Sequence, residues 1–302
     1  MRVDDLSPLL AGWQTVAGCG AGSATGSGAG VKWIGRGVTG GLFNVQCQAA
    51  YTRIRSAEKL EHHTFVNTMV TRDLGRKWIV GANVPFVYKY LEDYYYPNPL
   101  DPSVPAIDVS NGGLGDVSVL LSRRLGRINA TTVTATVGIP TGTYKAQYQM
   151  KPLHQHQQLG FGKVTLALSA DHTLDQIWGL VVVGGLASWR GGQNSLDSYR
   201  VPSATGYVYT GYYLGPFVPT VGLALTGFKG HDRDQTLQEN SGLFTAAGNV
   251  SVEWSTDYFA MLLGASLPYQ YDGITKDADG APRSPWGFGA WMVALGVATS
   301  PF

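Results

Sequence analysis

The residues of this chain with the most potential for chemistry are its 6 histidines. His154 and His156 flank Gln155, a spacing that puts both imidazole rings on one face of a strand, and Met150 lies just before them. Imidazole and thioether groups together suit a soft metal ion. Two strand histidines supply only two ligands, however, and no cysteine or carboxylate cluster accompanies them. We therefore predict no metal site.

Hydrolysis is the second chemistry to consider. A histidine with a serine two residues away on one strand face could cleave a lipid ester, but none of the 6 histidines has a serine at that spacing. Glycine- and serine-containing segments occur at 20–23 (GAGS) and 26–28 (GSG), yet no helix is expected after them, as the Gly-x-Ser-x-Gly nucleophile elbow requires. No lysine follows them at the spacing of a phosphate-binding loop. We interpret His62 and His63 as loop residues, and we predict no enzyme and no cofactor.

Composition narrows the class of protein that must position these residues. Only 14% of the 302 residues are charged, against about 25% in soluble domains, and 40 are glycine. We find no apolar run of about 18 residues, so a membrane-spanning helix is not expected. The net charge of +1 gives no electrostatic reason to bind nucleic acid.

The N-terminal part differs from the rest of the chain. Residues 18–41 are rich in Gly, Ala and Ser and have no period, so we divide the chain into an irregular segment, 1–42, and a folded domain, 43–302. Residues 18–41 are hypothesised to enter and plug the folded domain. The residues before Cys19 lack the basic start and long apolar core of an export signal, so we expect a trimmed chain or a different translation start. Cys19 and Cys47 could form a disulfide in an oxidising compartment, or Cys47 could be a small apolar strand residue.

A period of two runs from Phe43 to the end of the chain. Residues 43–53 alternate apolar and polar side chains, and from Trp78 to Tyr90 every second residue is apolar or aromatic. Such alternation predicts strands with one apolar and one polar face. We count about twelve such segments, joined alternately by short turns, such as one expected at 173–175, and long loops, such as one expected over 94–112. A single antiparallel up-and-down β-barrel in a bacterial outer membrane has this pattern, with apolar residues toward lipid and short turns in the periplasm.

The same alternation assigns candidate site residues. The polar face predicts lumen-lining side chains at Asn44, Gln46, Gln48, Lys77, Asn83, Lys89, Asp116, Ser118, Lys163, Asp171, Asn249 and Glu253. Aromatic residues near strand ends predict membrane girdles at Trp78, Tyr88, Tyr90, Trp178, Trp254, Tyr258 and Tyr269. Because the lumen residues carry both signs of charge, strong ion selectivity is not expected.

Three glycine-containing motifs carry a family resemblance. The segments 113–118 (GLGDVS), 138–142 (GIPTG) and 158–162 (QLGFG) resemble, in order and spacing, the family of the MetA-pathway of phenol degradation outer-membrane proteins. The resemblance implies an outer-membrane channel or transporter associated with aromatic catabolism. One departure is the last strand, whose apolar residues are out of step with the terminal Phe302.

The sequence therefore predicts a channel for passive passage of a small solute, aromatic or hydrophobic in character. Its expected partners are the lipid bilayer of a Gram-negative outer membrane, the solute, and further copies or other chains in a membrane oligomer. Two alternatives stay open: a non-conducting structural or assembly-partner barrel, and a lipid-modifying barrel enzyme. Twelve strands enclose a narrower space than the 16–18 strands of an open porin.

Overall fold

The computed structural model describes residues 43–55, 60–95, 106–125, 131–148, 151–153, 158–192, 202–228, 243–256, 259–272, 286–287 and 290–299. Within these residues the regular structure consists of strands and turns. No helix in this part of the chain is long and apolar enough to cross a membrane. The predicted girdle residue Tyr258, the pair His154 and His156, the segment 1–42 and the terminal Phe302 lie outside the described residues.

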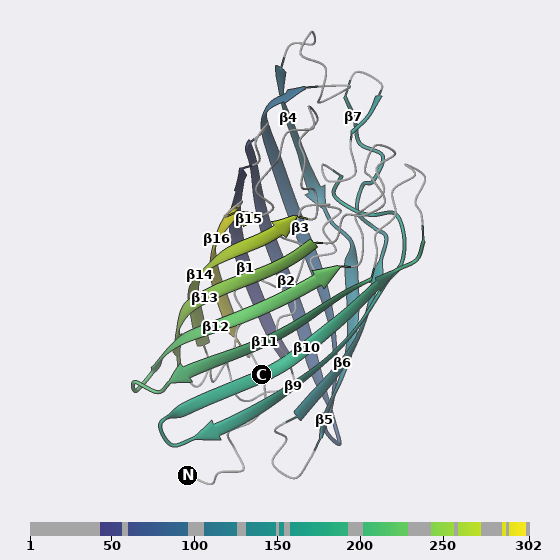
Figure 1. Cartoon of the computed structure of the whole chain (residues 1–302). Helices are drawn as coiled ribbons and strands as arrows, with labels where there is room; N and C mark the ends of the chain where they lie inside the picture. Colours follow the sequence, from purple (N-terminus) through teal and green to yellow (C-terminus); the bar gives the residue numbers. More distant parts are fainter. Residues whose placement is uncertain are drawn as a thin grey trace.

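The strands form one antiparallel barrel (Figure 1). Its walls are β1 (Phe43–Arg55), β2 (Leu60–Gly75), β3 (Trp78–Tyr95), β4 (Ala106–Leu114), β5 (Val117–Leu125), β6 (Thr131–Ile139), β9 (Thr165–Gln176), β10 (Gly179–Arg190), β11 (Ser203–Tyr212), β12 (Phe217–Phe228), β13 (Leu243–Ser255), β14 (Phe259–Asp272) and β16 (Ala290–Thr299). The short strands β7 (Gln147–Tyr148) and β8 (Lys151–Pro152) pair with each other in a separate sheet, and β15 (Trp286–Gly287) pairs with β14. β1 pairs with β16, which closes the sheet, and β4 and β5 together act as one wall strand. The predicted closed barrel of 12 antiparallel strands is confirmed.

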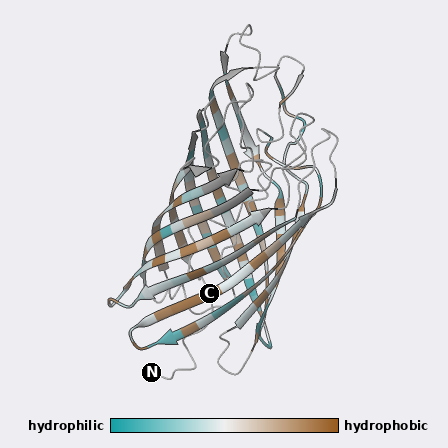
Figure 2. Ribbon diagram, viewed as in Figure 1, coloured by the Kyte–Doolittle hydropathy of each residue, from teal (hydrophilic) through white to brown (hydrophobic). Residues whose placement is uncertain are grey.

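Alternation along each strand explains why the sequence closes in this way. In β9, Leu166 and Leu168 are exposed on the outer surface while Ala167 and Ser169 between them are buried. The same period of two runs through β3, β12 and β16, where large apolar side chains stay exposed (Figure 2). A wall that is apolar outside and polar inside is stable only where lipid surrounds it.

The fourth wall strand is interrupted in the middle. β3 is 18 residues long and pairs with β4 through Phe86 and Leu114, then with β5 through Asn83 and Ser118. The two residues between β4 and β5 leave the ladder, although the amide of Gly115 still donates to the Pro85 carbonyl at 2.9 Å. The expectation of a loop over residues 94–112 was wrong at both ends, because β3 continues to Tyr95 and β4 starts at Ala106.

The short turns lie together at one end of the barrel, at the lower end in Figure 1. Between β2 and β3 the chain turns at Arg76 and Lys77, whose φ angles are 49° and 70°. Between β9 and β10 it turns at Ile177 and Trp178, three residues later than the turn expected at 173–175. The correction follows from pairing, since Gln176 still lies opposite Gly179 in the ladder.

Candidate functional site: the inner wall of the barrel

The inner wall of the barrel is lined mainly by buried polar side chains. Small hydroxyl residues predominate there, and several bond across strands: Ser122 to Thr134 at 2.8 Å, and Thr205 to Thr226 at 2.9 Å. Apolar contacts inside are confined to small clusters, such as Met69 with Leu262 and Ala294. An interior of this composition is hydrophilic, unlike the hydrophobic core of a soluble domain.

The predicted lumen residues fall into three groups in the structure. Buried on the inner side are Asn44, Gln46, Gln48, Lys89, Asp116, Ser118, Asp171, Asn249 and Glu253. Asn83 on β3 and Lys163, in the segment before β9, are half-buried. Lys77 does not face the inside of the barrel, since it lies exposed in the β2–β3 turn. The placement of Lys77 on a strand face was wrong because the chain already reverses there.

Asp116 organises the gap between β4 and β5. Its Oδ1 accepts a hydrogen bond from the Gly142 amide at 2.9 Å, and its Oδ2 accepts one from the Phe161 amide at 3.0 Å. Thr141 adds a bridge, because its hydroxyl donates to the Gly115 carbonyl and accepts from the Val117 amide. One buried carboxylate thus ties the β6–β9 connection to the interrupted wall strand.

Glycine is required where these backbones meet. A Cβ on Gly160 would lie 2.5 Å from Oδ1 of Asp116 and 2.6 Å from the Gly142 carbonyl oxygen. A Cβ on Gly142 would lie 2.9 Å from the Cα of Gly160. The three motifs noted in the sequence at 113–118, 138–142 and 158–162 therefore meet at a single place, which we call the Asp116 junction.

Lys89 supports the Asp116 junction from β3. Its ammonium donates to the Gln158 carbonyl at 2.5 Å, and the Lys89 side chain is fully buried. In the Gln158 side chain, Oε1 accepts a hydrogen bond from the Ala146 backbone N–H at 2.8 Å, and Nε2 donates one to the Leu153 carbonyl at 2.8 Å. These bonds hold the β6–β9 connection against the inner side of β3.

Two inner-wall residues next to Lys89 were missed by the sequence interpretation. His63 lies directly opposite Lys89 in the β2–β3 ladder, and its Nε2 lies 3.1 Å from the Glu61 carboxylate. Both are buried strand residues, so the interpretation of His63 as a loop residue was wrong. The signal was present, because Glu61 and His63 share the inner phase of β2 with Asn67 and Thr71.

Two tyrosines line the opposite inner wall. The Tyr207 hydroxyl donates to Asp171, and the ring of Tyr209 lies beside that of Tyr207, with 5.7 Å between centroids. Both rings lie flat on glycines of neighbouring strands. A Cβ on Gly184 would lie 2.6 Å from Tyr207, and one on Gly222 would lie 2.0 Å from Tyr209. The glycines thus form notches that keep the tyrosine rings against the wall.

Aromatic residues project outward near both ends of the strands. At the short-turn end, Trp78 is the first residue of β3 and its ring contacts the Arg123 guanidinium. Trp178 stacks on Tyr212 with 6.5 Å between ring centroids, and Trp254 contacts Phe259 with 6.0 Å between centroids. At the other end lie Tyr88, Tyr90 and Tyr269, all on the outward phase of their strands. These are the two levels at which a membrane girdle is expected.

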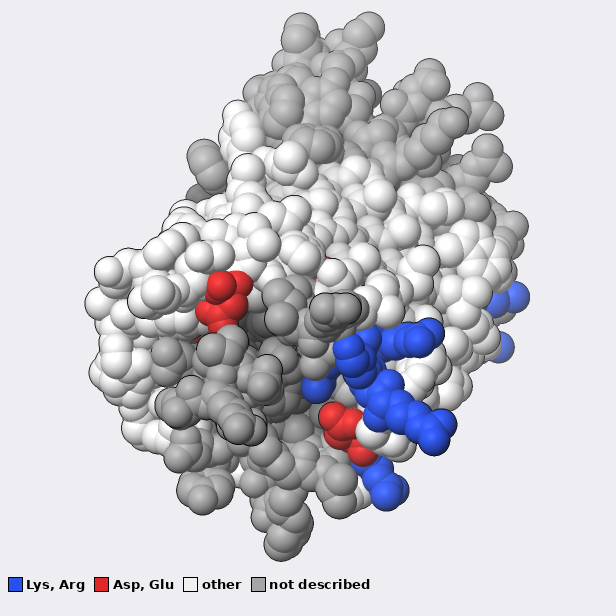
Figure 3. Space-filling view, turned by 90° about the horizontal axis from the view of Figure 1, so that it is seen from below, with Lys and Arg blue, Asp and Glu red and all other residues white. Residues whose placement is uncertain are grey.

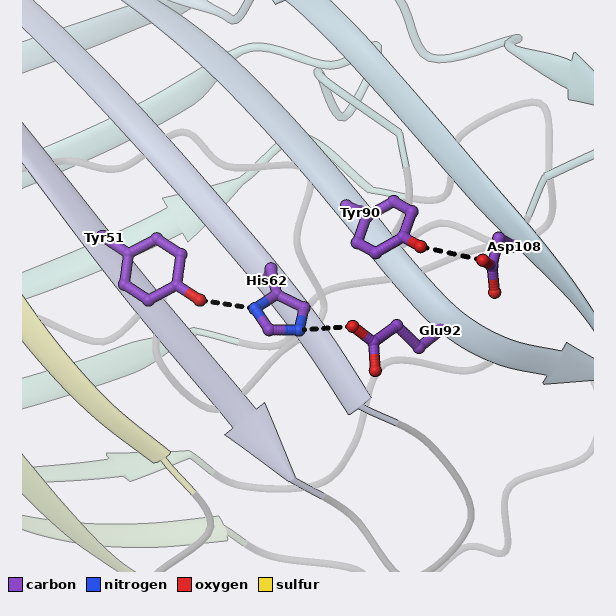
Figure 4. Close-up of polar contacts among 5 residues, drawn as sticks. All are labelled: Tyr51, His62, Tyr90, Glu92 and Asp108. Carbon is purple, nitrogen blue, oxygen red and sulfur yellow. Dashed lines mark hydrogen bonds and ion pairs between the residues drawn. The ribbon is translucent and has the colours of Figure 1, made fainter.

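A polar network crosses the outer wall at the long-loop end (Figure 4). The Tyr51 hydroxyl lies 2.5 Å from Nδ1 of His62, and Nε2 of His62 lies 3.2 Å from the Glu92 carboxylate. Tyr90 donates to Asp108 at 2.8 Å on the next strand pair. His62 was expected in a loop, but it lies on β2 and faces outward. The hydroxyl next to His62 is the phenol of Tyr51, not an aliphatic hydroxyl of the kind used as a nucleophile. The contacts of His62 with Tyr51 and Glu92 thus link β1, β2 and β3.

Among the described residues, no group of three or more His, Cys, Asp or Glu side chains is placed to hold a metal ion. Cys47 faces outward on β1, 3.9 Å from the Thr68 hydroxyl, and is a free thiol.

Comparison with known proteins identifies the fold. No family model and no curated protein matches the sequence. Among solved structures, the COG4313 outer membrane channel from Pseudomonas putida F1 has a TM-score of 0.58 and 14% identity, over 86% of this chain and 95% of that chain. The transport unit of the autotransporter AIDA-I from Escherichia coli has a TM-score of 0.48 and 10% identity, over 86% and 90%. A Pseudomonas aeruginosa FadL homologue has a TM-score of 0.44 and 8% identity, over 85% and 89%.

The first of these similarities and the lipid-facing outer wall lead to one conclusion. This chain is a β-barrel of the bacterial outer membrane, and the lipid bilayer is its environment.

Proposed function

We propose that this barrel is a channel for passive passage of a small solute with aromatic or hydrophobic character. The observation that carries the proposal is the closed wall whose inner face is polar, built from strands whose outer face is apolar. A barrel of this strand number encloses less space than a general porin, which favours small solutes. The inner charges Lys89, Asp171 and Glu253 include both signs, so strong ion selectivity is not expected.

The aromatic character of the solute is supported by one feature of the inner wall. Tyr207 and Tyr209 place two aromatic rings there, which suit contact with an aromatic solute. The three motifs that resemble the MetA-pathway of phenol degradation family meet at the Asp116 junction, so that resemblance supports a channel of this architecture and not a particular solute. No motif for energy coupling was found in the sequence, in keeping with diffusion.

Conductance in planar bilayers is the direct test. The full chain should give discrete current steps, and liposomes containing it should swell faster with phenols than with sugars of similar size. A folded, inserted protein that gives neither steps nor swelling would establish the non-conducting alternative. Deletion of residues 1–42 tests the hypothesis that this segment plugs the barrel, since the deletion should then raise conductance.

Neighbouring residues on β13 give a second test of the inner path. Asn249 is buried on the inner face, whereas Val250 is 56% exposed on the outer face. In a chain with both cysteines replaced by serine, a water-soluble cationic thiol reagent should lower conductance through Asn249→Cys. Val250→Cys should react only with a lipid-soluble maleimide. Equal reaction at both positions would contradict a water-filled inner path.

The lipid-modifying alternative makes a separate prediction. Since the outward His62 is held between Tyr51 and Glu92, any phospholipid hydrolysis by the purified barrel should fall when His62 is changed to Asn. We expect no hydrolysis by the unmodified protein. Turnover that depends on His62 would replace the channel proposal by an enzyme.

A further inference from the structure

Basic residues gather on one side of the short-turn end of the barrel. Figure 3, seen from that end, shows Lys and Arg side chains grouped on one side of the rim. The described residues of this group are Arg72, Arg76, Lys77, Arg123 and Arg124, contributed by β2, β3, β5 and the β2–β3 turn. The one acidic residue among them is Asp73, whose carboxylate lies 3.7 Å from Arg124. We call this group the basic rim.

Two of these arginines lie on the lipid-facing wall itself. Arg72 and Arg123 are exposed on the outward phase of β2 and β5. The guanidinium of Arg72 stands 5.2 Å from the Phe43 ring centre, and that of Arg123 stands 5.0 Å from the Trp78 ring centre. These distances fall within the range of a cation–π contact, which keeps each positive charge at the depth of the aromatic girdle.

The residues beside these arginines are apolar and point the same way. Val70 is 41% exposed one step up the outer face of β2, and Leu121 is 44% exposed one step up β5. The acyl chain of a lipid can therefore lie on Val70 or Leu121 while its headgroup reaches Arg72 or Arg123. Only β3 separates the two arginine strands, so their backbones are about 10 Å apart and face the same few headgroups.

We infer that the basic rim is a binding site for the phosphate of an anionic phospholipid in the leaflet at the short-turn end. Guanidinium groups match phosphate oxygens in bidentate geometry, and arginines near a membrane surface strengthen attraction to anionic lipid. The other side of the same rim lacks this chemistry in its described residues. There the β9–β10 turn carries Asp175, which accepts from Tyr213 at 2.7 Å, and Trp178 without a nearby arginine contact.

Tryptophan fluorescence can test the two sides of the rim in one protein. Two variants of the full chain keep a single tryptophan, either Trp78 at the basic rim or Trp178 opposite, with the other tryptophans changed to Phe. Each is placed in phosphatidylcholine bilayers that contain phosphatidylglycerol, with bromine on the acyl chains of one lipid or the other. The ratio of quenching by the two lipids gives the local preference for phosphatidylglycerol.

The expected result is a preference for phosphatidylglycerol at Trp78 and none at Trp178. Because an arginine near the surface contributes about 1 kcal/mol, each arginine removed should lower the relative affinity about five-fold. Arg72→Gln and Arg123→Gln should each reduce the preference for phosphatidylglycerol at Trp78, and the two together should reduce it further. Arg53→Gln, which removes an exposed arginine near the opposite end of β1, should leave the preference unchanged. High salt should reduce it.

Three results would overturn the inference. The first is equal quenching by both lipids at Trp78, and the second is a preference that survives in the Arg72→Gln/Arg123→Gln protein. The third is a competition experiment in which lipopolysaccharide displaces brominated phosphatidylglycerol from Trp78 at a lower concentration than unlabelled phosphatidylglycerol does. Heat-dependent mobility on a gel shows whether each variant is folded. If the double variant fails to fold, either single variant still decides the question.

Discussion

Replacing Asp116 tests the reasoning about the inner wall most directly. The carboxylate is buried and accepts hydrogen bonds from two backbone amides, those of Gly142 and Phe161. Asp116→Ala removes both acceptors and leaves the two amides without the bonds that they make in the folded barrel. Asp116→Asn keeps the shape but turns one acceptor into an amino group that faces an N–H.

The size of the effect follows from these two bonds. A hydrogen bond to a charged group contributes about 1.5–3 kcal/mol, so Asp116→Ala should lower the free energy of unfolding by about 3–6 kcal/mol. Asp116→Asn loses one of the two bonds and should cost about 1.5–3 kcal/mol. Since the junction also fixes the β6–β9 connection, both variants should show noisier single-channel currents than the original protein.

Unfolding in urea, followed by tryptophan fluorescence in lipid vesicles, measures these values. Asp175→Asn is a matched control, because Asp175 also accepts a hydrogen bond, from Tyr213 at 2.7 Å, but is exposed at the rim. We expect a change of less than about 1 kcal/mol for this control. If Asp116→Ala differs from Asp175→Asn by less than about 0.5 kcal/mol, the Asp116 junction does not stabilise the barrel and the reasoning is refuted.

Glycine positions give the remaining predictions. Gly160→Ala should destabilise the barrel by about 1–3 kcal/mol, because its new methyl group would meet Oδ1 of Asp116, and urea unfolding measures this. Gly206→Ala is the control, since no atom lies within 4 Å of its added Cβ, and a cost as large as that of Gly160→Ala would contradict the steric argument. Gly222→Ala should push the Tyr209 ring off the wall and destabilise by a similar amount. A Tyr209→Leu change in the same chain should recover most of that loss in a double-mutant cycle, and no recovery would show that ring contact is not the cause.

The sequence was sufficient to predict the wall of the barrel. Strand alternation could be read because the two faces of each strand meet different surroundings, lipid outside and a polar interior inside. That contrast gave the strand number and placed Asn249 and Glu253 on the buried side. It failed at Lys77, because the Arg76–Lys77 turn has positive φ angles without the Asn-Gly signal that usually marks such a turn.

The interior connections could not be predicted from local pattern. The amides that Asp116 binds lie 26 and 45 residues away in the chain, so no window around Asp116 reveals its role. The same holds for Lys89, whose partner carbonyl on Gln158 lies 69 residues further on. His63 is a different case, since it was assigned to a loop although its phase on β2 already placed it inside.

The Asp116 junction also bears on what a motif resemblance can mean. Its three glycine-containing segments contact one another. Asp116 accepts hydrogen bonds from two backbone amides, and Gly142 and Gly160 allow their backbones to approach closely. A likeness in these segments therefore reports how the break between β4 and β5 is bridged and how the β6–β9 connection is held. Choice of solute is expected to depend on other inner positions, among which Tyr207 and Tyr209 present aromatic rings. Two barrels could share the junction and still pass different compounds, so solute assays on Tyr207→Leu will say more about specificity than any change at the junction.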